Sequence, residues 1–165
     1  MVNNKSQIRK KQYENAILYF LKYCNNQHLG KTKLNKLLYY LDFISFRDRK
    51  QAVTGDIYLH TQYGPVPETV DIILKDLQKE NFITIEKISL DENKDKWEHK
   101  LLKDPDLSVF DGYEKNLLEN ICKEFNLWST DKIVEQTHLE APWFYSKPYE
   151  EVDYKYANDI EFFPK

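Results

Sequence analysis

The chain of 165 residues has the length of one ordinary domain, and its 41% hydrophobic content excludes wholesale disorder. Basic residues number 24 and acidic residues 27, so the net charge of −3 gives no overall attraction to nucleic acid or to a membrane surface. No apolar run approaches the ~20 residues that span a bilayer, and the polar N-terminal sequence has no apolar region typical of a signal peptide, so we expect a cytoplasmic protein.

Two helices are predicted in the first third of the chain. Residues 8–23 carry apolar side chains at helical spacing, and turn-forming residues follow at 25–30. Thr32 is the expected N-cap of a second helix over residues 33–49. That helix is apolar on most of its faces, which is typical of a helix buried inside a domain. We therefore expect it to be the central helix of the fold.

The segment from Thr54 to Val70, TGDIYLHTQYGPVPETV, begins with the alternation typical of a half-buried strand. Gly64 and Pro65 are expected to end this strand, and Pro67 suits the first turn of a helix whose apolar stripe runs over residues 70–77. Residues 82–88 and 97–102 then form a predicted hairpin, which resembles the wing of a winged-helix domain in outline.

The last third of the chain is predicted to be helical, followed by an aromatic tail. A helix is expected over residues 112–125, and Ser129 or Thr130 caps another, which ends near Pro142. The aromatic and acidic tail, residues 145–165, is expected to pack back on the body. The predicted fold is a single α+β domain over residues 1–165, mostly helical, with a small antiparallel sheet beside the central helix.

Most of the sequence patterns tested for chemistry fail. Gly30-Lys31-Thr32 matches only the end of a P-loop, because Asn25 stands where the first glycine belongs. No histidine pairs with another histidine or a cysteine at metal-ligand spacing, and Cys24 and Cys122 are isolated and far apart. We therefore predict reduced thiols, no catalytic residue set, no metal and no cofactor.

Two patterns leave alternative functions open. Asp56, Tyr58 and His60 would stand in a row on one strand face, either as general acid–base groups of a hydrolytic or small-molecule-binding domain or as an ordinary solvated face. The lysines at 31, 33 and 36 make the start of the central helix basic, which with the hairpin suggests a winged-helix-like DNA-binding regulator. The apolar faces of that helix and the acidic total disfavour nucleic acid as a partner.

Three segments in order resemble the SocA-like antitoxin family, also called the Panacea domain, of bacterial and phage proteins. The first is a K-L-x-K-L-L-Y helix, the second a T-G-D-x-Y strand that ends in Y-G-P-V-P, and the third a helix that ends in H-x-x-x-P-W. The matching residues are Lys33, Leu34, Lys36, Leu37, Leu38, Tyr39, Thr54, Gly55, Asp56, Tyr58, Tyr63, Gly64, Pro65, Val66, Pro67, His138, Pro142 and Trp143. The tail, residues 145–165, is the least family-like part.

The resemblance implies an antitoxin that neutralises a cognate toxin by direct protein–protein binding, with a further role as an adaptor that hands the toxin to a cytosolic protease or chaperone. The 15% aromatic content fits a protein-binding surface. The candidate partner-binding residues are Asp56, Tyr58, His60, Tyr63, Pro65 and Trp143. The sequence leaves open which of them contact the toxin and which hold a rigid corner of the fold.

Overall fold

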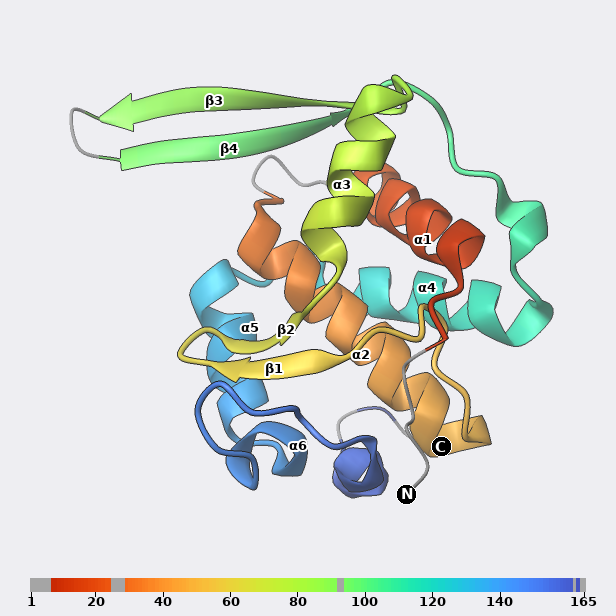
Figure 1. The fold of residues 1–165 in the computed structure, drawn as a ribbon, viewed down its shortest axis with the longest axis vertical. Helices are drawn as coiled ribbons and strands as arrows, with labels where there is room; N and C mark the ends of the chain where they lie inside the picture. Colours follow the sequence, from red (N-terminus) through yellow and green to blue (C-terminus); the bar gives the residue numbers. More distant parts are fainter. Residues whose placement is uncertain (1–6, 25–28, 92–93, 162, 164–165) are drawn as a thin grey trace.

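The computed structural model describes residues 7–24, 29–91, 94–161 and 163 (Figure 1). The described helices are α1 (Lys10–Tyr23), α2 (Lys31–Arg49), α3 (Val70–Lys79), α4 (Gly112–Phe125), α5 (Thr130–His138) and α6 (Ala141–Phe144), with 3-10 turns η1 (Leu107–Val109) and η2 (Tyr154–Asp159). The strands form two separate antiparallel hairpins, β1 (Tyr58–Thr61) with β2 (Gly64–Pro67) and β3 (Ile83–Asp91) with β4 (Lys94–Leu101). The predicted α+β class with a helical majority is confirmed, although two small sheets replace the one expected.

The central position predicted for the second helix is also confirmed. In Figure 1, α2 runs diagonally through the molecule, with α4 on one side, α5 on the other and the β1–β2 hairpin crossing it. Its buried residues extend from Lys33 to Arg47 and include polar side chains as well as apolar ones. The expected cap is wrong: the helix begins at Lys31 after Gly30, without a side-chain cap bond, so Thr32 lies inside the first turn.

The β1–β2 hairpin corrects the predicted end of the first strand. Gly64 and Pro65 do not terminate the sheet but begin β2, which pairs with β1 so that Thr61 faces Gly64 and Tyr58 faces Pro67. Pro67 is therefore the last residue of a strand and does not open α3. A two-stranded hairpin tolerates these prolines because each strand has one edge that makes no ladder bonds to the other.

The tail packs against the body, as expected, and completes this region. The backbone N–H of His60 donates to the carbonyl of Glu150 at 2.9 Å, and the N–H of Val152 donates to the carbonyl of Tyr58 at 2.7 Å. On α2, Arg47 donates through Nη1 to the carbonyls of Ile160 and Phe163. The tail is thus held both along the free edge of β1 and against the central helix.

The remaining elements agree closely with their predicted bounds. The β3–β4 hairpin extends away from the helical body in Figure 1, and its strands are longer than expected. Helix α4 covers the predicted residues, with a capping box made by Asp111 and Glu114. Ser129 is the N-cap of α5. None of the helices in the described ranges is long and apolar enough to cross a membrane.

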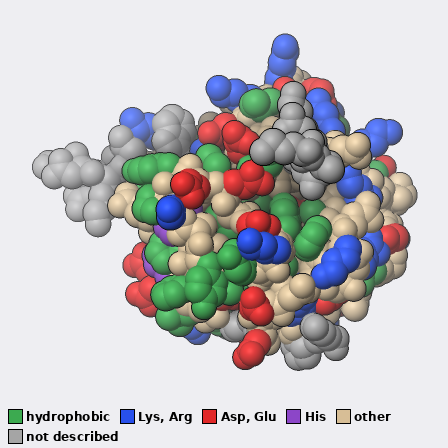
Figure 2. All heavy atoms as spheres, turned by 60° about the horizontal axis from the view of Figure 1, so that its bottom comes forward, with side chains coloured by type: hydrophobic (Ala, Val, Ile, Leu, Met, Phe, Trp, Pro, Cys, Tyr) green, Lys and Arg blue, Asp and Glu red, His purple; other side chains and the backbone are tan. Residues whose placement is uncertain are grey.

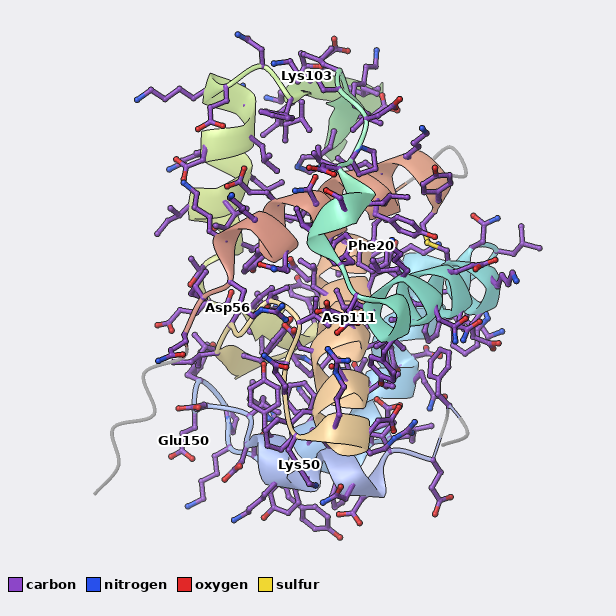
Figure 3. All side chains as sticks on the ribbon, turned by 90° about the vertical axis from the view of Figure 1, so that its right-hand side faces the viewer. Phe20, Lys50, Asp56, Lys103, Asp111 and Glu150 are labelled. Carbon is purple, nitrogen blue, oxygen red and sulfur yellow. A yellow bond between two sulfur atoms is a disulfide. The ribbon has the colours of Figure 1, made fainter. Side chains whose placement is uncertain are left out.

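The two cysteines correct another expectation, because they are not isolated. Cys24 follows the end of α1, and Cys122 lies in α4, 98 residues later, with a distance of 5.2 Å between their Cα atoms. The structure joins them as a disulfide, which appears in yellow beside α4 in Figure 3. The prediction of reduced, isolated thiols is therefore wrong for this structure.

Candidate functional site

Asp56 lies just before β1 and is completely buried. Its carboxylate accepts hydrogen bonds from the Tyr13 hydroxyl at 2.7 Å, from the Thr69 backbone N–H and hydroxyl at 2.9 Å each, and from the Ile57 N–H at 2.8 Å. These bonds tie α1, the start of β1 and the start of α3 to one carboxylate. Asp56 therefore holds the junction of three elements, on the left at mid-height in the view of Figure 3.

A second buried carboxylate, Asp42 of α2, holds the neighbouring residues. It accepts the Tyr58 hydroxyl at 2.5 Å, the Thr54 hydroxyl at 2.5 Å and the Thr54 N–H at 2.7 Å. Burial raises the pKa of Asp42 to about 6, although these hydrogen bonds act in the opposite direction. The T-G-D-x-Y motif is thus a buried hydrogen-bond network that fixes β1 on the central helix.

The expected faces of β1 are consequently reversed. Asp56, Tyr58 and His60 are buried, whereas Ile57 and Leu59 are only half-buried. The predicted alternation is confirmed, but the row of Asp56, Tyr58 and His60 faces inward. It can do so because hydroxyl groups and rings from distant parts of the chain provide hydrogen-bond and stacking partners for these side chains. Asp56 and Tyr58 therefore offer neither a solvated face nor an open acid–base site.

His60 continues the row into an aromatic stack. The indole of Trp143, on α6, lies between two imidazoles, with centroid distances of 4.2 Å to His60 and 4.0 Å to His138. The Trp143 indole N–H donates to the carbonyl of Thr61 at 2.9 Å. This stack joins the second motif to the third, although they are about eighty positions apart in the chain.

Hydrogen bonds determine which nitrogen of His60 carries the proton. The Ser146 hydroxyl donates to the Trp143 carbonyl at 2.8 Å, so it accepts from Nδ1 of His60, 2.7 Å away. Burial lowers the pKa of both His60 and His138, and Lys36 and His60 lower that of His138 further. Both rings therefore favour the neutral form more than a free imidazole does. Nε2 of His138 is buried and has no hydrogen-bond partner among the described residues.

Two of the three lysines on which the DNA-binding alternative rests, Lys33 and Lys36, are structural as well, whereas Lys31 is partly exposed and pairs with Asp71. Lys36 is fully buried and donates from Nζ to the carbonyl of Pro65 at 2.6 Å, and burial lowers its pKa to about 7. Lys33 is also buried and donates to the carbonyls of Asn126 and Trp128. Neither ammonium group faces solvent, so neither is placed to contact a phosphate backbone.

A groove of about 380 Å³ opens beside the aromatic stack. We call it the aromatic groove; it is lined by His60, Thr61, Gln62, His138, Trp143, Pro148 and Tyr149. Tyr149, which lines it, is 86% exposed, and three aromatic residues close to lining residues in the sequence are also exposed: Phe144 at 65%, Tyr145 at 63% and Tyr63 at 57%. Figure 2 shows apolar side chains gathered beside histidines on the face that holds α6 and the tail.

The structure divides the predicted partner-binding residues into two groups. Asp56, Tyr58 and Pro65 are buried and support the hairpin, while His60 and Trp143 line the aromatic groove and Tyr63 is exposed next to it. Sequence reasoning did not single out Tyr149, which lines the groove. Its only signal was the high aromatic content of the tail. No group of three or more potential metal ligands occurs within the described ranges.

The fold and this groove define a small, mostly helical α+β protein in which the second and third motifs meet at an aromatic stack, while the first lies in the buried central helix. The family model described as "Antitoxin SocA-like, Panacea domain" matches residues 34–144, more than half of the chain. The chain therefore belongs to the SocA-like antitoxin family, as its three motifs predicted. No curated protein and no solved structure was found to match it.

Proposed function

We propose that this protein is a cytoplasmic bacterial or phage antitoxin that neutralises a cognate toxin by direct protein–protein binding. The family match supports a toxin–antitoxin role. The observation that supports direct binding of a toxin is the presence of exposed aromatic side chains at and near the aromatic groove. Exposed Tyr and Trp side chains are enriched among residues that dominate binding energy, and contiguous exposed apolar surface marks interaction sites.

In this proposal the three motifs supply a rigid frame for the contact surface. The carboxylates of Asp42 and Asp56 fix the hairpin on α1, α2 and α3, and the stack on Trp143 fixes α6 against the hairpin. The tail, residues 145–161, adds Pro148 and Tyr149 to the lining of the groove. Because the tail is the least family-like part of the chain, we assign it the tuning of partner choice. Delivery of the bound toxin to a cytosolic protease or chaperone is a compatible further step.

Rescue of growth by co-expression tests the proposal. A gene next to that of this protein should be toxic alone and harmless when this chain is co-expressed. We expect Tyr63→Ala and Tyr149→Ala each to weaken toxin binding by about tenfold or more, since truncation of a hot-spot tyrosine costs about 2 kcal/mol or more and a tenfold change corresponds to about 1.4 kcal/mol. Ile72→Ala on α3 and Leu102→Ala after β4 are matched controls, because both residues are apolar and similarly exposed but lie outside this surface.

Two results would contradict the proposal. The first is that no neighbouring gene product is toxic and rescued by this chain. The second is that the tyrosine variants and the control variants weaken binding equally, which would place the toxin on another surface. The enzyme alternative gains no support from the geometry, because Asp56 and Tyr58 are buried in the network that holds the hairpin.

A further inference from the structure

Negative charge is concentrated in one part of the molecule. Residues 131–161, which contain nearly all of α5, α6 and most of the tail, include eight acidic and three basic residues, a net charge of −5. The rest of the chain carries 21 basic and 19 acidic residues, a net charge of +2. The elements that carry most of the exposed aromatic rings are therefore also the acidic ones, although the whole chain is nearly neutral.

A second hollow lies between the C-terminal end of α5 and the tail. We call it the acidic notch; it has a volume of about 310 Å³ and is lined by Gln136, Leu139, Glu140, Asp159 and Glu161. Leu139 is 80% exposed at its rim, and His138, the preceding residue, lines the aromatic groove. Asp159 and Glu161 are exposed, and neither forms an ion pair with any described residue.

Glu140 is the unusual residue of the acidic notch, because its side chain is buried without a cationic partner among the described residues. It is only 7% exposed, and its carboxylate accepts the hydroxyls of Tyr39 and Tyr40 at 3.1 Å each and the Gln136 amide at 3.4 Å. All three donors are neutral. Burial raises its pKa to about 7, against the effect of these bonds. Since a carboxylate has about four acceptor sites, at least one remains for an incoming donor.

We propose that the toxin surface that docks here is basic and inserts an arginine side chain into the acidic notch, where its guanidinium meets Glu140, Asp159 and Glu161. This inference rests on the proposed antitoxin function and names the chemistry of the partner. Arginine fits better than lysine, because its planar guanidinium presents several N–H donors and bonds carboxylates in a bidentate manner. The acidic surface would also speed association with a basic toxin.

Charge reversal tests this inference on the toxin identified by growth rescue. The double variant Asp159→Lys/Glu161→Lys should weaken toxin binding by tenfold or more, and its affinity should depend less on salt than that of the wild type. The matched control is Glu80→Lys/Glu124→Lys, which makes the same change in net charge at exposed positions, one at the end of α3 and one on α4. We expect the control to change affinity less than threefold.

The variant Glu140→Gln tests whether toxin binding depends on the negative charge of the Glu140 side chain or only on its size. It keeps the size of the side chain and an acceptor for the tyrosine hydroxyls, so we expect a folded protein that binds toxin at least tenfold more weakly at pH 8. If the toxin is neutralised but neither Glu140→Gln nor the Asp159/Glu161 double variant weakens binding beyond the control, the inference is wrong while the antitoxin proposal stands.

A capped tetra-arginine peptide tests the acidic notch without any toxin. In NMR titrations, the methyl resonances of Leu139 should shift with tetra-arginine, less with tetra-lysine, and not with tetra-glutamate. The shift should disappear in Asp159→Lys/Glu161→Lys and persist in Glu80→Lys/Glu124→Lys. If no neighbouring toxin exists, the antitoxin proposal fails, and this titration then decides alone whether the notch binds arginine. Equal shifts in both double variants would overturn it.

Discussion

At the scale of single residues, the protein keeps ionisable groups inside its core. Asp42, Asp56 and Lys36 are completely buried and Glu140 nearly so. Asp42, Asp56 and Lys36 each fix the β1–β2 hairpin on the helical body through hydrogen bonds. Buried charges without ionic partners destabilise a fold unless hydrogen bonds compensate them. The four groups therefore differ in what their removal should do to stability and to binding.

Replacement of Glu140 by glutamine should stabilise the free protein at alkaline pH. The pKa of Glu140 is raised from 4.5 to about 7 by burial, so the folded state binds a proton more tightly than the unfolded state. The stability that Glu140 contributes is thus fully present below about pH 4.5 and is lost as pH rises through 7. Relative to wild type, Glu140→Gln should gain up to about 3 kcal/mol in unfolding free energy between pH 4.5 and pH 8.

Urea unfolding at the two pH values measures this difference, with Glu124→Gln on the exposed side of α4 as the control. The control should show little change between them. An identical effect of Glu140→Gln at pH 4.5 and pH 8 would contradict the assignment of Glu140 as a buried carboxyl with a raised pKa. A stabilised variant that has lost toxin binding would mean that the buried charge is retained for function at the expense of stability.

Replacement of Asp56 by alanine should destabilise the fold strongly. The change leaves the Tyr13 hydroxyl and both polar groups of Thr69 without their acceptor inside the protein. We expect Asp56→Ala to lower the unfolding free energy by about 3–5 kcal/mol. The control variant is Asp153→Ala, at the exposed N-cap of η2, which should lower it by about 1 kcal/mol or less. Denaturant titration measures both. A fully stable Asp56→Ala protein that no longer neutralises toxin would show that Asp56 acts in binding and does not hold the corner.

At the scale of elements, the β1–β2 hairpin depends on one glycine. Gly64 has φ +88°, and a Cβ atom there would lie 2.8 Å from Cε of Lys36 and would also overlap the Thr137 hydroxyl. Gly64→Ala should therefore lower the unfolding free energy by about 2–4 kcal/mol through backbone strain and overpacking.

Gly112 provides the matched control for this change. It begins α4 without a positive φ, and a Cβ atom at this position would have no other atom within 4 Å, so Gly112→Ala should be neutral or slightly stabilising. Thermal unfolding of both variants is the measurement. Equal effects would mean that the contacts of Gly64 with α2 and α5 do not determine the hairpin.

Helix α4 and the β1–β2 hairpin show where prediction from the sequence succeeds and where it fails. The bounds of α4 agree with the prediction to the residue, because its apolar stripe and the residues before it are local signals. The faces of β1 were reversed, because the groups that satisfy Asp56, Tyr58 and His60 come from α1, α2 and α6. Local alternation cannot show which row distant side chains will cover. The motif residues of the site were found by resemblance, whereas the acidic notch requires α2, α5 and the tail to be packed together.

At the scale of the whole molecule, the disulfide links two helices that both pack on α2. Cys24 and Cys122 close a loop of 98 residues that contains the central helix, both hairpins and α3. Such a link restricts the unfolded chain, and disulfides are typically worth about 2–4 kcal/mol. The α1–α4 side of the fold should therefore respond to redox conditions more than the aromatic surface does.

Reduction should lower the melting temperature without abolishing toxin binding. A stability loss of about 2–4 kcal/mol corresponds to a decrease in Tm of about 10 °C for a chain of this size, and Cys24→Ala/Cys122→Ala should reproduce it. Calorimetry with and without a thiol-free reductant measures the shift, and the double variant should then be insensitive to reductant. Because the cysteines contribute to neither the aromatic groove nor the acidic notch, affinity for the toxin at about 20 °C should stay within about twofold of wild type. An equally stable reduced protein would show that packing of α1 and α4 on α2 holds this side of the fold without the covalent link.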